Sequence, residues 1–193
     1  MATSPTGFDQ WIGFILVDEG PELNQNAQEP GGASRFGVSV DALTDYHHSV
    51  GLPVATIADV VAITSDQAIA FYRWYLSSLM LDQLPAAIAY RLADIATNLG
   101  QVGGARALCL ALGVWPLSDQ VTPALCGAAR QLDQTQLICA LSGVWMGQKH
   151  GAGKGWEQDG HGWTARRNKA HARALSLITV ALGANSVSSG RTL

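Results

Sequence analysis

Two carboxylates and a hydroxyl, Glu19, Glu29 and Ser34, lie within 16 residues of one another in a polar, glycine-rich part of this 193-residue chain. Hydrolysis of a glycosidic bond needs one carboxylic acid that donates a proton to the leaving oxygen. It also needs a second carboxylate that binds water or attacks the anomeric carbon. The residue types suit this chemistry. The spacing alone is weak evidence and is more typical of acids on a solvated loop, so both interpretations stay open here.

A helix that precedes these residues must position the first of them. Five apolar residues follow the spacing of one helix face: Phe8, Trp11, Ile12, Ile15 and Leu16. This pattern predicts an amphipathic helix over about residues 7–18, so Glu19 stands where the helix stops. Residues 20–38 are rich in Gly, Pro, Asn and Gln, which predicts an irregular loop or a short hairpin.

The rest of the chain is dominated by helical patterns. Thr64 and Gln67 have the spacing of a capping box that opens a helix containing Phe71, Trp74, Tyr75 and Leu79. Pro85 is placed as the first-turn proline of the next helix. Further helices are expected over 40–50, 56–63, 86–98, 102–112, 122–131, 134–147 and 164–182, followed by a flexible tail over 184–193. The predicted fold is mainly α, with one small hairpin or irregular loop.

Composition excludes several classes of protein. Apolar residues make up 48% of the chain, which is enough for a packed core. A net charge of −3 argues against a nucleic-acid binder that works through its overall charge. The apolar stretch over 174–184 is about half the length that spans a bilayer, so no stable membrane insertion is expected. Cys109, Cys126 and Cys139 lie among aliphatic residues and are expected to be buried thiols.

Charge is distributed unevenly along the chain. Residues 1–144 carry five basic and 13 acidic groups, a net charge of −8. Residues 145–193 carry seven basic and two acidic groups, a net charge of +5. A basic end suits an anionic polymer as partner, and a solvated helix face explains the same charges equally well.

The segment from Glu19 to Ser39 reads EGPELNQNAQEPGGASRFGVS. It resembles the opening motif of the glycoside hydrolase 108 muramidases, E-G-G-Y-x-N-D-P-x-D-P-G-G-x-T-x-Y-G-I-T. The chain departs from that motif at Pro21, Glu22 and Gln25, carries one extra residue before Pro30, and has Glu29 where the family has Asp. Glu19 thus keeps the place of the motif's first carboxylate, whereas Glu29 is longer than the motif's Asp and shifted by one residue.

Later segments extend the resemblance over roughly residues 8–182. Phe71–Tyr75 is similar to the family's F-Y-x-x-x-Y segment, and Asp94–Gly100 is similar to its D-x-A-x-N-x-G helix. Residues 112–125 and Gly162–Arg167 resemble the peptidoglycan-binding region that commonly follows. The resemblance implies a lysozyme-like α+β fold with a catalytic region over 1–102 and a helical peptidoglycan-binding region over 103–183.

The resemblance also implies roles for individual residues. Glu19 is the expected general acid, and Glu29 with Ser34 is expected to hold the attacking water. Expected substrate-binding residues are Gly31, Gly32, Phe36, Asn98, Trp163, Arg166 and Arg167. Structural roles remain as alternatives: turns for the glycines, core packing for Trp163 and a buried polar network for Asn98.

The implied function is hydrolysis of the β-1,4 bond between N-acetylmuramic acid and N-acetylglucosamine, without a metal or another cofactor. The expected partner is bacterial peptidoglycan, and the expected state is a monomer. The first basic residue is Arg35, so no secretory signal is predicted. A phage-type endolysin of this kind would wait in the host cytoplasm until its release to the wall, or would travel in a phage-like particle. The alternative is a wall-binding or secretion-assisting protein whose catalytic loop has decayed.

Overall fold

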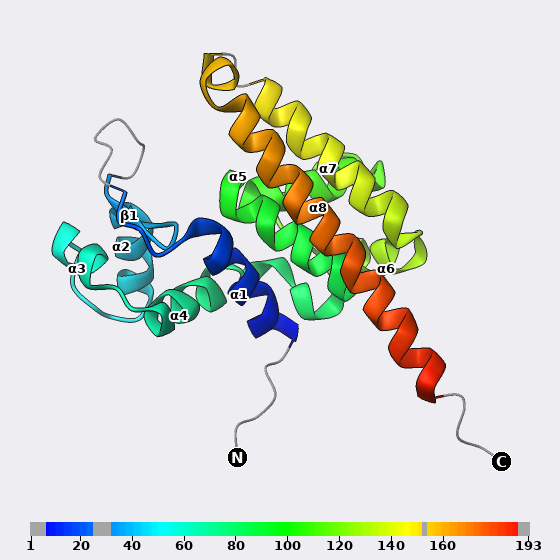
Figure 1. The fold of residues 1–193 in the computed structure, drawn as a ribbon, viewed down its shortest axis with the longest axis horizontal. Coiled ribbons are helices and arrows are strands. Elements are labelled where there is room, and N and C mark those ends of the chain that lie inside the picture. Colours follow the sequence, from blue (N-terminus) through cyan, green and yellow to red (C-terminus); the bar gives the residue numbers. More distant parts are fainter. Residues whose placement is uncertain (1–6, 25–31, 152–153, 189–193) are drawn as a thin grey trace. The chain divides into compact units, whose positions relative to one another are not determined.

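The computed structural model describes residues 7–24, 32–151 and 154–188. These residues form eight α-helices, two 3-10 helices and one two-stranded antiparallel hairpin (Figure 1). The chain divides into two compact units, Met1–Ser77 and Ser78–Leu193. The prediction of a mainly helical fold with one small hairpin is confirmed.

The first unit contains four helices and the hairpin. Its elements are α1 (Gly7–Glu19), β1 (Ser34–Arg35), β2 (Val38–Ser39), α2 (Val40–Ser49), α3 (Ile57–Ala62) and α4 (Ser65–Tyr75). Side-chain oxygens cap three of the helices: Ser39 caps α2, Thr56 caps α3 and Thr64 caps α4. Thr64 and Gln67 form the predicted capping box, with the backbone amide of Thr64 donating to the Gln67 side chain over 2.8 Å.

Helices α1 and α4 pack against each other, and the hairpin strands contact α3 (β1) and α2 (β2). The α1 side chains at Trp11, Ile12 and Ile15 are buried, as the periodicity of the sequence predicts. Phe71 and Tyr72 of α4 are buried as well. An ion pair between Arg73 and Asp9, 2.7 Å long, joins the two helices at their surface.

The second unit is built around three long helices. Its elements are the 3-10 helix η2 (Leu81–Gln83) and helices α5 (Ala86–Leu112), α6 (Pro123–Gln131), α7 (Gln134–His150) and α8 (Lys154–Ser188), and the 3-10 helix η1 (Ser77–Leu79) begins at the boundary. Helices α5, α7 and α8 lie side by side and pack on one another (Figure 1). In the described part of the chain, no helix combines the length and the apolar character that crossing a membrane requires.

Several boundaries differ from the prediction. Helix α5 runs through the predicted gap between 98 and 102, and Gly100 interrupts it with φ +76° and ψ 166°. That conformation is accessible essentially to glycine alone, so the glycine at position 100 allows the helix to break there. Helix α4 ends at Tyr75 because the chain turns into η1. Helix α8 begins ten residues earlier and ends six residues later than predicted.

One predicted burial is wrong. Cys109 and Cys126 are buried, and burial raises the pKa of the Cys126 thiol. Cys139 is exposed instead. On α7 the buried face is occupied by Leu137, Ile138 and Leu141, so the intervening position points away from the core. The division into functional regions at 102/103 stays a prediction, and α5 spans that position.

Candidate active site

Glu19 is the last residue of α1, as its place in the sequence predicts. Gly20 follows with φ +74°, a left-handed conformation that ends the helix. The Gly20 amide still donates to the Leu16 carbonyl over 3.0 Å. The side chain of Glu19 is therefore carried by a fixed helix end and is partly buried.

The hairpin turn forms one wall against Glu19. Strands β1 and β2 pair Ser34 with Ser39 and Arg35 with Val38, which leaves Phe36 and Gly37 as a two-residue turn. Both turn residues have positive φ, 53° and 74°, as tight hairpins with a type I′ turn require. The Tyr72 hydroxyl on α4 donates a hydrogen bond to the Phe36 carbonyl over 3.0 Å and holds the turn in place.

Gly37 lets the turn approach the carboxyl group closely. A Cβ added at Gly37 would lie 2.8 Å from both Cγ and Cδ of Glu19 and 2.6 Å from the Tyr72 hydroxyl. No side chain fits in that space, because real Cβ atoms do not approach other atoms so closely. The wall beside Glu19 is thus bare backbone, fixed by α4.

Two sets of contacts fix the chain on either side of this turn. Asn24 and Ser34 exchange backbone hydrogen bonds of 2.8 Å in both directions. The Arg35 guanidinium donates to the Pro21 carbonyl over 2.9 Å and to the Val61 carbonyl over 2.6 Å. Arg35 thereby ties the segment after α1 to the end of α3. Sequence reasoning treated Arg35 only as a charge and missed this positioning role.

These contacts enclose a polar pocket of about 370 Å³. The described residues that line it are Glu19, Glu22, Asn24, Gly32, Ser34, Gly37 and Ser39. The lining offers carboxylates, hydroxyls and an amide, groups that exchange hydrogen bonds with sugars. The Ser39 hydroxyl also caps α2, because it accepts a hydrogen bond from the Ala42 amide over 3.2 Å.

The pocket brings together three of the predicted site residues: Glu19, Gly32 and Ser34. Glu29 and Gly31 lie outside the described residues. Phe36 contributes the turn and its carbonyl, and its ring lies 5.4 Å from the Arg35 guanidinium.

The pocket also contains residues that were missed. Glu22 is a second carboxylate in the lining, and Asn24, Gly37 and Ser39 complete it. A signal for Glu22 exists in the sequence, because an acid stands there in place of the motif's tyrosine. In the described residues, no group of three or more His, Cys, Asp or Glu side chains is arranged to hold a metal ion.

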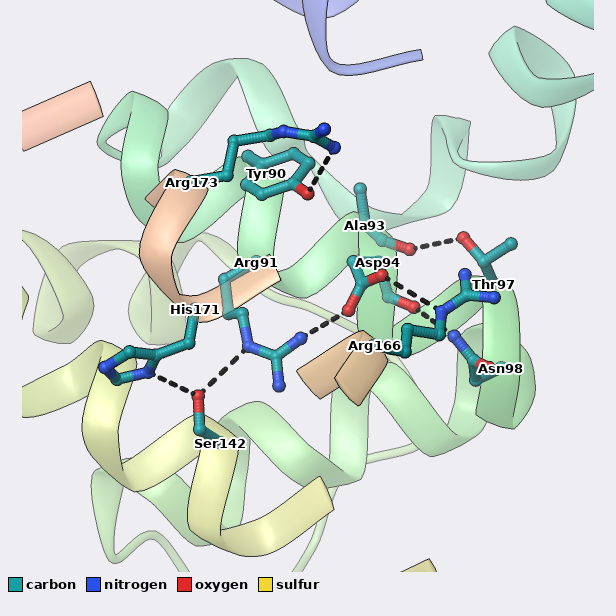
Figure 2. A network of polar contacts seen from close by, with 10 residues as sticks. All are labelled: Tyr90, Arg91, Ala93, Asp94, Thr97, Asn98, Ser142, Arg166, His171 and Arg173. Carbon is teal, nitrogen blue, oxygen red and sulfur yellow. Dashed lines mark hydrogen bonds and ion pairs between the residues drawn. The ribbon is translucent and has the colours of Figure 1, made fainter. Parts of the chain in front are cut away.

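The remaining predicted residues lie in the second unit, where Asn98 and Arg166 belong to a buried polar network (Figure 2) and Trp163 and Arg167 stand on α8. Asp94 on α5 forms an ion pair with Arg91, and both side chains are almost completely buried. Arg166 on α8 places Nε 3.5 Å from the Asp94 carboxylate. Asn98 donates to the Asp94 carbonyl over 2.9 Å. This hydrogen bond matches the alternative role of Asn98, which is membership of a buried polar network.

Helix α7 joins the same network through Ser142. Arg91 donates to the Ser142 hydroxyl over 3.2 Å, and the hydroxyl lies 3.0 Å from Nδ1 of His171 on α8 (Figure 2). Burial lowers the pKa of Arg91 from its ordinary value, against the opposing effect of Asp94. Burial, followed by Arg91 and Arg167, lowers the pKa of His171.

Much of the basic charge expected on a solvated face is therefore engaged inside the second unit. Arg173 donates to the Tyr90 hydroxyl over 3.2 Å, and Nε of Arg166 lies 3.5 Å from the Asp94 carboxylate. Lys149 lies 4.5 Å from the ring centroid of Trp163, a cation–π contact. A role of Asn98, Trp163, Arg166 and Arg167 in substrate binding stays a prediction.

Comparison with known proteins covers both the sequence and the fold. Residues 12–100 match the family model described as Glycosyl hydrolase 108. The solved structure titled "Structure of Brucella abortus SagA" is similar to this chain, with a TM-score of 0.78 and 25% sequence identity over 88% of this chain and 94% of that one. Among curated proteins, none matches the sequence.

Proposed function

We propose that this chain, in which residues 12–100 form a glycosyl hydrolase 108 domain, cleaves the β-1,4 bond between N-acetylmuramic acid and N-acetylglucosamine in peptidoglycan. The match of residues 12–100 to this family supports a glycoside hydrolase. The observation that carries the proposal is the pocket in which Glu19, fixed at a helix end, shares a polar lining with Ser34 and the carboxylate of Glu22.

Glu19 is the proposed general acid. It donates its proton to the glycosidic oxygen as the bond to the anomeric carbon breaks, a role that requires a carboxylic acid within hydrogen-bond reach of that oxygen. A second carboxylate and the Ser34 hydroxyl hold the attacking water and stabilise the positive charge that develops on the sugar. The resemblance assigns the second carboxylate to Glu29.

Glycines keep the mouth of the pocket free of side chains. Gly32 has φ +74°, and a Cβ added there would meet no atom within 4 Å. Gly37 presents backbone beside Glu19. At Gly32 a sugar ring can therefore approach the main chain closely, whereas the space at Gly37 is taken by Glu19 and Tyr72.

We also propose that the helical region over 103–183 contributes to binding of the wall. Lys169 on α8 is exposed, and an exposed cation attracts an anionic polymer over roughly 8 to 10 Å at physiological salt. The protein would act as a monomer, as a phage-type endolysin released from the host cytoplasm to the wall.

A second candidate function is suggested by the departures from the motif at Pro21, Glu22 and Gln25. In that alternative the protein binds the wall or assists secretion without catalysis. A zymogram containing purified peptidoglycan separates the two functions, because clearing requires bond cleavage and a binder only sediments with the wall.

Mass spectrometry of the products released from defined peptidoglycan tests the bond that is cleaved. New reducing ends on N-acetylmuramic acid are expected. Reducing ends on glucosamine would assign the other glycosidic bond, and 1,6-anhydro ends would assign a lyase. Either of these products would refute the proposed reaction.

A further inference from the structure

We infer that Glu22 supplies the second carboxylate of the pocket and binds the water that attacks the anomeric carbon. This inference rests on the proposed function and names a catalytic residue that the family motif does not contain. Glu22 stands three residues after Glu19 and lines the same pocket.

The Glu22 side chain lies beside Gly20 at the end of α1. Its Oε2 would stand only 2.3 Å from a Cβ added at Gly20, so a side chain at position 20 would collide with this carboxylate. Gly20 therefore ends the helix and also leaves the space that the carboxylate takes. Glu19 lies against Gly37 on the hairpin turn, whereas Glu22 lies against Gly20. The two acids thus reach one pocket from different parts of its wall.

Hydrogen bonds fix the backbone on both sides of Glu22. The carbonyl of Pro21, one residue before it, accepts the hydrogen bond from Arg35. Asn24, two residues after it, is paired with Ser34 in both directions. Catalytic groups need such support, because a small displacement of a reacting group lowers the rate strongly. Glu22 has this support although its side chain is solvent-accessible.

The charges of the pocket lining and the volume of the pocket also suit this role. The described residues that line the pocket include two carboxylates and no cation. With Glu19 protonated as the acid, Glu22 is the anion that stabilises an oxocarbenium-like transition state. The volume of about 370 Å³ is far larger than the roughly 10–15 Å³ that a cavity needs to hold one water molecule. The pocket can therefore hold a water molecule beside a sugar.

The chemical step balances with these two residues alone. The water oxygen forms a bond to the anomeric carbon as the bond to the leaving oxygen breaks. Glu22 takes a proton from the water, and Glu19 gives its proton to the leaving oxygen. Exchange with solvent then returns both carboxyl groups to their starting states, so no other reactant is required.

Azide rescue tests the inference directly. Glu22→Gln is expected to lower the rate of wall hydrolysis by at least 100-fold while the melting temperature stays unchanged. Glu22→Ala opens space for an added anion, and sodium azide is expected to restore turnover and to yield a glycosyl azide detectable by mass spectrometry. A residue that only shapes the loop would give no such product. Asp41→Asn, an exposed carboxylate in the first turn of α2, is the matched control and is expected to keep full activity.

Three outcomes would overturn the inference. One is full activity of Glu22→Gln, and another is loss of activity in Glu22→Ala without any azide product. The third is azide rescue of Glu29→Ala in place of Glu22→Ala, which would assign the second carboxylate to Glu29. Failure of the proposed function is seen separately, because it would show as the wrong products from the unsubstituted protein or as an active Glu19→Gln variant.

Discussion

Gly37 lies so close to Glu19 that one added methyl group would stand 2.8 Å from the carboxyl carbon. The same methyl group would lie 2.6 Å from the hydroxyl of Tyr72, which holds the hairpin turn through the Phe36 carbonyl. Glu19, the turn and α4 therefore form one fitted arrangement. Its geometry depends on a glycine at position 37 for both backbone conformation and space.

Gly37→Ala is expected to lower stability and activity together. A non-glycine residue in the left-handed region costs about 1 kcal/mol or more, and forcing atoms into a filled space adds about 1–3 kcal/mol. Gly51→Ala is the matched control, because Gly51 has φ +76° and an added Cβ there meets nothing within 4 Å. Urea unfolding and turnover of both variants check the prediction. Equal losses in the two variants would show that the contact with Glu19 carries no weight.

Glu19→Gln is expected to remove catalysis and leave the fold intact. Glutamine keeps the size and polarity of the side chain but donates no carboxylic proton. General acid catalysis typically contributes 10²–10⁴ in rate, about 3–5 kcal/mol of barrier. The measurement is release of reducing ends from purified walls, accompanied by thermal unfolding. A normally melting variant that clears walls at the unsubstituted rate would exclude Glu19 as the acid.

Asp94→Ala is expected to destabilise the second unit by about 3–5 kcal/mol, because it leaves the buried Arg91 without its counter-charge. Asp119→Ala removes a carboxylate paired with Arg106 at 2.6 Å, where both side chains are at least half exposed. An exposed pair is worth only about 0–1 kcal/mol, so this variant serves as the control. Urea unfolding followed by circular dichroism compares the two. A similar, small effect of both substitutions would contradict the role assigned to the buried pair.

Stability is expected to fall as the pH drops below about 6.5, partly because of His171. Burial, Arg91 and Arg167 lower its pKa in the folded protein below the ordinary value of 6.5. The unfolded chain then binds the proton first, so the free energy of unfolding is complete above about pH 6.5 and decreases below it. His171→Gln should flatten this part of the pH profile. His161→Gln, an exposed position on the same helix, should leave it unchanged, and identical profiles for both variants would refute the assignment.

The sequence predicts the position of Glu19 well, because the spacing from Phe8 to Leu16 defines where a helix face ends. It also predicts the capping of α4, since Thr64 and Gln67 act within one turn. It does not predict the placement of Glu22. The direction of that side chain depends on the left-handed Gly20 and on tertiary contacts made by Arg35, which have no local pattern.

The basic C-terminal part shows a similar limit. Counting charges gives +5 for residues 145–193 but does not tell which cations face water. Arg166 pairs with Asp94, and Arg173 donates to Tyr90. Each of these partners lies more than 70 residues away in the sequence. The packing of α8 against α5 brings these two side chains to their partners.

The backbone hydrogen bonds between Asn24 and Ser34 fix the position of Ser34. The position of its hydroxyl therefore does not depend directly on the number of residues between the two. Nine residues separate the two ends, and the sequence carries one residue more than the related motif at this point. The conformational entropy cost of closing a loop grows slowly with its length, by about 0.6 kcal/mol for each doubling. One extra residue before Pro30 is therefore compatible with an unchanged position of the Ser34 hydroxyl in the pocket, and the Asn24–Ser34 pair is the contact that any change of length in this connection must preserve.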